Sequence, residues 1–196
     1  VFTQTLDGSH ANIRNIRNSL NAGTSVTINT KAGQLSDIIV AGAISKTTGA
    51  AATLTLNASN DIKVNSTISS TSNALNIAMN AGHDIIVTPT TAGAIQSNGG
   101  SVSLNAANNI NLSGTNAQVA IKSANGAVNL TSNNLTVASK IDAGTGVVTI
   151  SPYTSTQAIQ IGAGAVDNAT TLGVSNTDIA NIKASTLAIG STTSTG

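Results

Sequence analysis

Short runs in which apolar and polar residues alternate recur along the chain. The run LTLNASNDIKV begins at Leu54, LNIAMNAGHDIIV at Leu75, VSLNAANNINL at Val102 and VNLTSNNLTV at Val128. Each run holds one apolar pair, a small polar break and a second apolar pair. A third apolar position then follows in the repeats, at Ile44, Ile68, Ile95, Val119, Ile121 and Ile141. Alternation with a period of two indicates half-buried strands, so each repeat predicts three short strands.

The repeat spacing indicates how these strands are arranged. It varies over roughly 20 to 28 residues, within the range of solenoid proteins. Three strands per repeat predict one coil of a parallel β-helix, and we expect residues 1–196 to form a single β-solenoid segment. The first apolar pairs should form the core stack, with Leu54, Leu75, Val102 and Val128 one above another. That stack comprises Val26, Ile28, Leu54, Leu56, Leu75, Ile77, Val102, Leu104, Val128, Leu130, Val148 and Ile150.

The physical reason for coiling is burial. A strand of a few residues cannot bury its apolar face alone, whereas stacked coils hide every second side chain and pair every backbone group. Each inward Val, Ile or Leu contributes about 1.5–3 kcal/mol when fully buried. The insertions Thr47–Thr53 and Thr88–Gly93 should bulge from the corners without disturbing the stack.

Two segments depart from the strand pattern. HANIRNIRNSLNAG has apolar residues at helical spacing (Ile13, Ile16 and Leu20), with Ser9 as a candidate cap and Gly23 as a stop. SNTDIANIKAS repeats this spacing more briefly, after Ser175 or Asn176. We therefore expect short helical turns near residues 10–22 and 176–183.

Composition narrows the class of protein. Charged residues make up 8% and aromatic residues 1% of the 196 residues, the net charge is +1, and all seven acidic residues are Asp. So small a charge argues against electrostatic recognition of nucleic acid or of an anionic membrane. No apolar run approaches the roughly 18 residues of a membrane span, so we expect no membrane insertion. The chain has no cysteine and hence no disulfide framework.

The stretches LNAGTSVTINT (20–30), LTLNASNDIKV, LNIAMNAGHDIIV and LGVSNTDIANIKASTLAIGS (172–191) carry a family resemblance. The chain is similar to filamentous-haemagglutinin-like, β-strand-repeat exoproteins, bacterial surface adhesins that are typically exported by two-partner secretion. The resemblance covers nearly the whole chain and implies a right-handed parallel β-helix. The amino-terminal secretion domain of such proteins is not among these residues, so we expect a fragment of a longer repetitive chain.

Candidate metal ligands occur just before the second strand of successive repeats. Asp37, Asp61 and Asp84 recur at this place, and a cation could bind three stacked carboxylates. The next two repeats have Asn109 and Asn134 instead, so we favour turn capping and expect no metal site. The Gly-Gly-x-Gly-x-Asp rhythm of calcium-binding β-rolls is absent.

Other chemistries find little support in the sequence. A polysaccharide-active enzyme needs clustered carboxylates, and sugar binding favours aromatic platforms, yet Phe2 and Tyr153 are the only aromatic residues. His10 and His83 are far apart, and we expect His83 to be a solvated corner residue. No set of nucleophile, base and orienting residue emerges, so we expect no catalytic residues, no cofactor and no enzyme. Arg14 and Arg17 fit the solvent-exposed face of a short helix better than a basic surface that binds nucleic acid.

These inferences favour an architectural role. We expect an extracellular segment of a bacterial surface fibre, acting as an adhesin or stalk in cell adhesion or biofilm. Its expected partners are neighbouring coils or copies of the same or a longer chain, and host or bacterial surface glycans. A glycan- or receptor-binding module that uses the corner loops is the alternative, and a polysaccharide-active enzyme is the weaker third.

Overall fold

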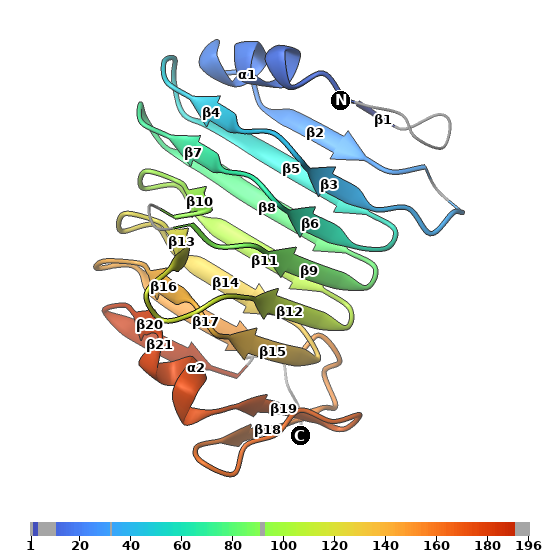
Figure 1. Cartoon of the computed structure of the whole chain (residues 1–196), viewed down its shortest axis with the longest axis vertical. Coiled ribbons are helices and arrows are strands. Elements are labelled where there is room, and N and C mark those ends of the chain that lie inside the picture. The colour runs from blue at the N-terminus through green and yellow to red at the C-terminus, as the bar shows by residue number, and fades with distance from the viewer. Residues whose placement is uncertain (1, 4–10, 32, 91–92, 191–196) are drawn as a thin grey trace.

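The chain is a right-handed parallel β-helix that winds down one axis (Figure 1). The computed structural model describes residues 2–3, 11–31, 33–90 and 93–190. Three parallel sheets, here called sheets A, B and C, form the faces of the coil. Each regular coil passes through A, B and C in turn, so every strand inside a sheet pairs with one strand in the coil above and one in the coil below.

Sheet A has the order β1 (Phe2–Thr3), β2 (Val26–Asn29), β5 (Ala52–Ala58), β8 (Leu75–Ala81), β11 (Val102–Ala106), β14 (Val128–Thr131), β17 (Val147–Ser151) and β21 (Thr186–Ile189). Sheet B comprises β3 (Ile38–Val40), β6 (Ile62–Val64), β9 (Asp84–Val87), β12 (Asn109–Leu112) and β15 (Asn134–Val137). Sheet C comprises β4 (Ile44–Lys46), β7 (Ile68–Ser70), β10 (Ile95–Gln96), β13 (Val119–Lys122), β16 (Lys140–Asp142) and β20 (Ile182–Lys183).

The alternating sequence pattern becomes an alternation of burial. In β5 the burial pattern changes at every residue, with Ala52, Leu54, Leu56 and Ala58 buried and the three residues between them half-buried. In sheets B and C the apolar residues stack in the register that the repeats predict. Examples are Ile62 over Ile85 in sheet B and Ile68 over Ile95 in sheet C.

The core stack in sheet A differs from the prediction in one coil. Leu54 pairs with Ile77, and Leu75 pairs with Ala52, so the expected alignment of Leu75 under Leu54 was wrong by two residues. The reason is that β8 begins one inward position before the residue that pairs with the start of β11. Leu75 occupies this extra position and stacks under Ala52. Below it, Gly100 packs so closely on the Leu75 carbonyl that a Cβ would lie 2.3 Å from that oxygen.

The other members of the predicted stack lie inside the coil. Val26 is half-buried in the first coil, and the remaining predicted residues are buried. Ile77 pairs with Val102, which pairs with Val128, which in turn pairs with Val148. The column therefore continues beyond the predicted set, to Leu187 in β21.

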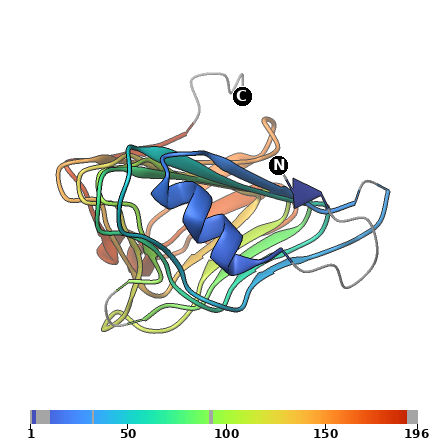
Figure 2. The ribbon, with the colours of Figure 1, turned by 90° about the horizontal axis from the view of Figure 1, so that it is seen from above.

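The helix α1 (Ile13–Asn21) lies across the amino-terminal end of the coil, as Figure 2 shows from above. Its buried residues Ile16 and Leu20 join the hydrophobic core. The cap is Asn12, whose side chain accepts hydrogen bonds from the N–H groups of Arg14 and Asn15. The expectation of Ser9 as the cap was therefore wrong, and Ser9 itself lies outside the described residues.

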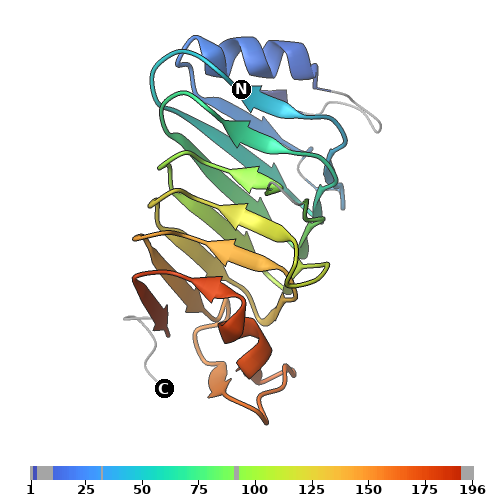
Figure 3. The same ribbon diagram turned by 60° about the vertical axis from the view of Figure 1, so that its left-hand side comes forward.

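The chain leaves the regular coil after β17. It forms a separate pair of parallel strands, β18 (Ala158–Ile161) and β19 (Thr171–Val174), before the helix α2 (Asn176–Ala180) leads into β20 and β21. Ser175 caps α2 in a capping box with Asp178. Figure 3 shows α2 and this strand pair at the carboxyl-terminal end, opposite α1.

The two predicted insertions have different outcomes. The first is shorter than expected, because Ala52 and Thr53 belong to β5 and only residues 47–51 form the corner. Thr88–Gly93 connects β9 to β10, and two of its residues lie outside the described part of the chain.

Candidate functional site

A column of polar side chains runs down the corner at which sheet B begins. Asp37 Oδ1 accepts hydrogen bonds from the N–H of Asp61 (3.2 Å) and from the Asn60 side chain (2.7 Å). Asp84 Oδ1 likewise accepts from the N–H of Asn109 (3.1 Å) and from the Asn108 side chain (2.7 Å). Capping of the local turn was the predicted role of these acids; the structure shows instead that each accepts a backbone N–H of the following coil, where sheet B begins.

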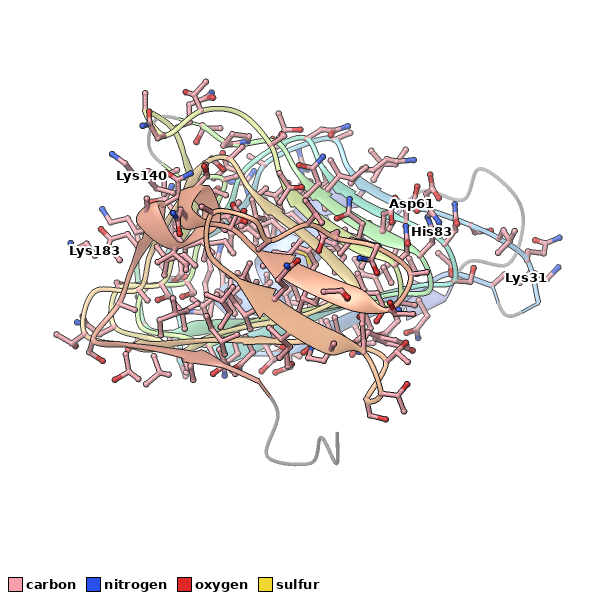
Figure 4. All side chains as sticks on the ribbon, turned by 90° about the horizontal axis from the view of Figure 1, so that it is seen from below. Lys31, Asp61, His83, Lys140 and Lys183 are labelled. Atoms are coloured by element: carbon pink, nitrogen blue, oxygen red, sulfur yellow. The ribbon has the colours of Figure 1, made fainter. Side chains whose placement is uncertain are left out.

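His83 occupies the middle of this column. Its Nδ1 lies 3.1 Å from Asp61 Oδ1 and 3.4 Å from Asp84 Oδ2. Asp61 Oδ1 also accepts the N–H of Asp84 at 3.1 Å. Figure 4 shows Asp61 and His83 side by side at this corner. His83 is exposed, as expected, but it contacts two carboxylates, which the sequence did not indicate.

Lys63 connects the two upper acids of the column. Its Nζ lies 2.5 Å from Asp37 Oδ2 and 3.2 Å from Asp61 Oδ2. Burial opposes ionisation of Asp37, but the hydrogen bonds from Lys63, Asn60 and the Asp61 N–H outweigh it and lower the pKa of Asp37. Hydrogen bonds to Asp37 and Asp61 raise the pKa of Lys63. This part of the corner is thus an ion-paired network.

A second polar column lies inside the corner between sheets C and A. Lys46 is fully buried, and its Nζ donates to the carbonyl oxygens of Thr48 (2.9 Å), Gly49 (3.1 Å) and Ser72 (2.5 Å). In the coils below, buried serines donate from Oγ to the carbonyl three residues ahead, as Ser97 does to Gly100. The sequence signal is a Lys or Ser two residues after the third apolar position in four successive coils, at Lys46, Ser70, Ser97 and Ser123, and the apolar repeat does not reveal it.

The carboxyl-terminal edge of sheet B is closed by side chains. Asp167 Oδ2 accepts the N–H of Leu135 (3.0 Å), Asp178 Oδ1 accepts the N–H of Val137 (2.7 Å), and the Asn181 amide donates to the Val137 carbonyl (2.7 Å). Burial raises the pKa of Asp167, despite hydrogen bonds from two backbone N–H groups. A groove of about 300 Å³ runs alongside, lined by β15 and by these two acids. The side chains of this region thus take the place of a further strand.

Three comparisons of the chain with known proteins gave no match. No model of a known protein family, no curated protein and no solved structure matches it. Within the described residues, no helix has the length and apolar character needed to cross a bilayer. The fold and these polar columns are therefore the basis for inferring function.

Proposed function

We propose that the chain is a structural and adhesive segment of an extracellular fibre on the bacterial cell surface. The observation that carries this proposal is the continuous aliphatic column of sheet A, which connects strands from β2 to β21 through parallel ladders. A dry column flanked by three hydrogen-bonded sheets resists bending and proteolysis, because local opening breaks pairings with two neighbouring coils.

The outer surface of sheet A suits lateral packing. Asparagine side chains are linked along it, from Asn57 to Asn29 (2.7 Å) and from Asn80 to Asn57 (2.8 Å). Thr27, Thr55 and Ala78 stand in the neighbouring outward row. Uncharged, flat rows of this kind can lie against a copy of the chain or a surface glycan without a desolvated unpaired charge.

A non-enzymatic role is part of the proposal. The carboxylates of Asp37, Asp61 and Asp84 accept backbone N–H groups of the next coil, which is a structural use. The resemblance to filamentous-haemagglutinin-like exoproteins supports the same reading and suggests two-partner secretion as the export route.

Localisation on intact cells tests the proposal. Antibodies raised against the chain should label filaments on unpermeabilised cells of the source bacterium, and deletion of its gene should reduce attachment. A control antibody against a cytoplasmic protein should label only permeabilised cells. Labelling that requires permeabilisation would refute an extracellular fibre.

The alternative function is a glycan- or receptor-binding module that uses the corner loops. The first corner is fixed in place, since Asn21 Oδ1 accepts the N–H groups of Thr47 (2.8 Å) and Thr48 (3.3 Å). The second loop, Thr88–Gly93, is also held, since Thr90 pairs with Val119, so both loops remain candidates for docking. A glycan-array signal that disappears when either loop is shortened would favour the alternative.

A further inference from the structure

Asp61, His83 and Asp84 bring three metal-ligating atoms to one exposed corner. The candidate atoms, one from each residue, all lie within 4.8 Å of one another. Asp61 comes from the coil of β6, whereas His83 and Asp84 belong to the next coil, at the start of β9. The exposed ring of His83 leaves the cluster open to solvent.

The distances suit coordination of a small cation. Ligands bound at about 2.1 Å are about 3.0 Å apart in octahedral and about 3.4 Å apart in tetrahedral geometry. His83 Nδ1 lies 3.1 Å from Asp61 Oδ1 and 3.4 Å from Asp84 Oδ2, and both distances fall in the range between two ligands of one cation. A cation would then replace the proton between the ring nitrogen and the carboxylates.

The imidazole distinguishes this coil from its neighbours. Backbone hydrogen bonds stack Asn60, His83 and Asn108 at equivalent positions. Both asparagines donate to the aspartate of the preceding coil, at 2.7 Å, so an amide suffices for the structural role. In the middle coil a histidine stands at that position, which adds a ring nitrogen as a ligand beside two carboxylates.

The two carboxylates are already oriented. The N–H of Asp84 holds Asp61 Oδ1, while Asn108 and the N–H of Asn109 hold Asp84 Oδ1 and leave Oδ2 directed at His83. Hydrogen bonds that fix ligand orientation raise metal affinity. Mixed imidazole and carboxylate ligands favour Zn²⁺ and its first-row neighbours over Ca²⁺ or Mg²⁺.

We propose that Asp61 Oδ1, His83 Nδ1 and Asp84 Oδ2 form a surface site for a divalent transition-metal cation of the Zn²⁺ type, with water completing the coordination. The cation joins two successive coils at their shared corner. Lys63 opposes it, because its ammonium group lies 3.2 Å from Asp61 Oδ2. The Lys63 ammonium lies closer to Asp37, at 2.5 Å, and stays paired there when the cation binds.

Calorimetric titration of the tag-free chain with ZnCl₂ tests the site. The parent chain should bind one Zn²⁺, and His83→Asn should weaken binding by about tenfold or more, at least the loss seen when a partner of a metal ligand is removed. This variant is well matched, because asparagine is the residue found in the coils above and below. The control His10→Asn changes the other histidine of the chain and should leave the affinity unchanged.

Two further variants make the result decisive. Asp61→Asn should weaken binding, and Lys63→Met should strengthen it by removal of the competing charge. Circular dichroism of each variant without metal establishes that it is folded, and Lys63→Met provides a gain of affinity that misfolding cannot produce. Undetectable heat with the parent chain, or equal affinity in the parent and His83→Asn, would overturn the proposal.

Discussion

Single polar side chains decide how each corner of the coil is built. Recurrence of Asp37, Asp61 and Asp84 before the second strand indicated capping of the local turn, but each carboxylate accepts an N–H group of the next coil instead. The acceptor role across coils could not be predicted, because it depends on which residue of the next coil lies opposite. The charge of Lys46 gave no hint of burial, since lysines are rarely buried without a partner. Its partners are backbone carbonyls, which no side-chain pattern reveals.

Replacement of Lys46 tests the importance of the inner column. Lys46→Met keeps the length of the side chain but removes three hydrogen bonds; the Gly49 and Ser72 carbonyls keep donors from Asn73 and Ser70, whereas the Thr48 carbonyl loses its donor. We therefore expect a loss of about 1–3 kcal/mol in the free energy of unfolding. Urea denaturation measures it. The control Lys140→Met alters an exposed lysine and should change stability by less than about 0.5 kcal/mol. Equal effects of the two variants would contradict a structural role for the buried ammonium.

The pKa of Asp37 predicts part of the acid sensitivity. Because its pKa is lower in the folded state than the ordinary 3.8, Asp37 contributes stability that is complete above that value and disappears as pH falls through the folded pKa. Asp37→Asn should therefore show a smaller fall in Tm between about pH 5 and pH 2. Thr55→Ala, which changes no titratable group, should follow the parent curve. Parallel curves for the parent and Asp37→Asn would refute this assignment.

At the scale of elements, the strands were predictable and the departure from the coil was not. Strict alternation in Leu54–Val64 defines strands whose inward side chains are all apolar. The register of sheet A was ambiguous from the sequence because β8 has one more inward residue than β11. Aligning the first apolar residues of the repeats gives the wrong register, whereas aligning the Asn-Ala pairs at the strand ends (Asn57-Ala58 with Asn80-Ala81) gives the observed one. The strands β18 and β19 were missed because neither alternates: three of the four residues in β18 are exposed, whereas three consecutive residues of β19 are buried.

Closure of sheet B by side chains predicts a specific change in hydrogen exchange. Asp178→Ala removes the acceptor of the Val137 N–H, so exchange at that amide should accelerate by about 10- to 100-fold. Exchange at Val87, which lies in the same column within the sheet, should not change. Exchange is measured by NMR on the folded protein. Unchanged protection at Val137 would mean that packing, and not the carboxylate, protects the edge.

For the molecule as a whole, the two ends differ. The helix α1 covers the core at one end, whereas Asp167, Asp178 and Asn181 close sheet B at the other. In the described part of the chain, β21 is the last strand of sheet A, and its inward residues Leu187 and Ile189 are only half-buried. End-to-end contact is therefore expected to involve β21.

Sedimentation at increasing concentration tests this asymmetry. The chain should self-associate, and the double variant Thr186→Lys with Ala188→Lys should associate less, since outward charges on an edge strand disfavour strand addition. The control places two lysines on internal strands of the other faces, at Ser69 in sheet C and Asn111 in sheet B, and should behave like the parent. A parent chain that stays monomeric at about 100 μM, well into the concentration range at which exposed strand edges associate, would argue against edge pairing.

The one-way linkage of the acidic column has a consequence for how the protein forms. Asp37 accepts an N–H of the second coil, and Asp61 accepts one of the third. Each folded coil therefore presents a carboxylate acceptor to the coil that follows it in the sequence. In a chain that is synthesised or exported with its amino terminus first, each new coil would find the acceptors of the preceding coil already in position. The coils would then fold one after another, starting from the α1 end. The coil folded last would at each stage be the one most open to proteolysis and hydrogen exchange.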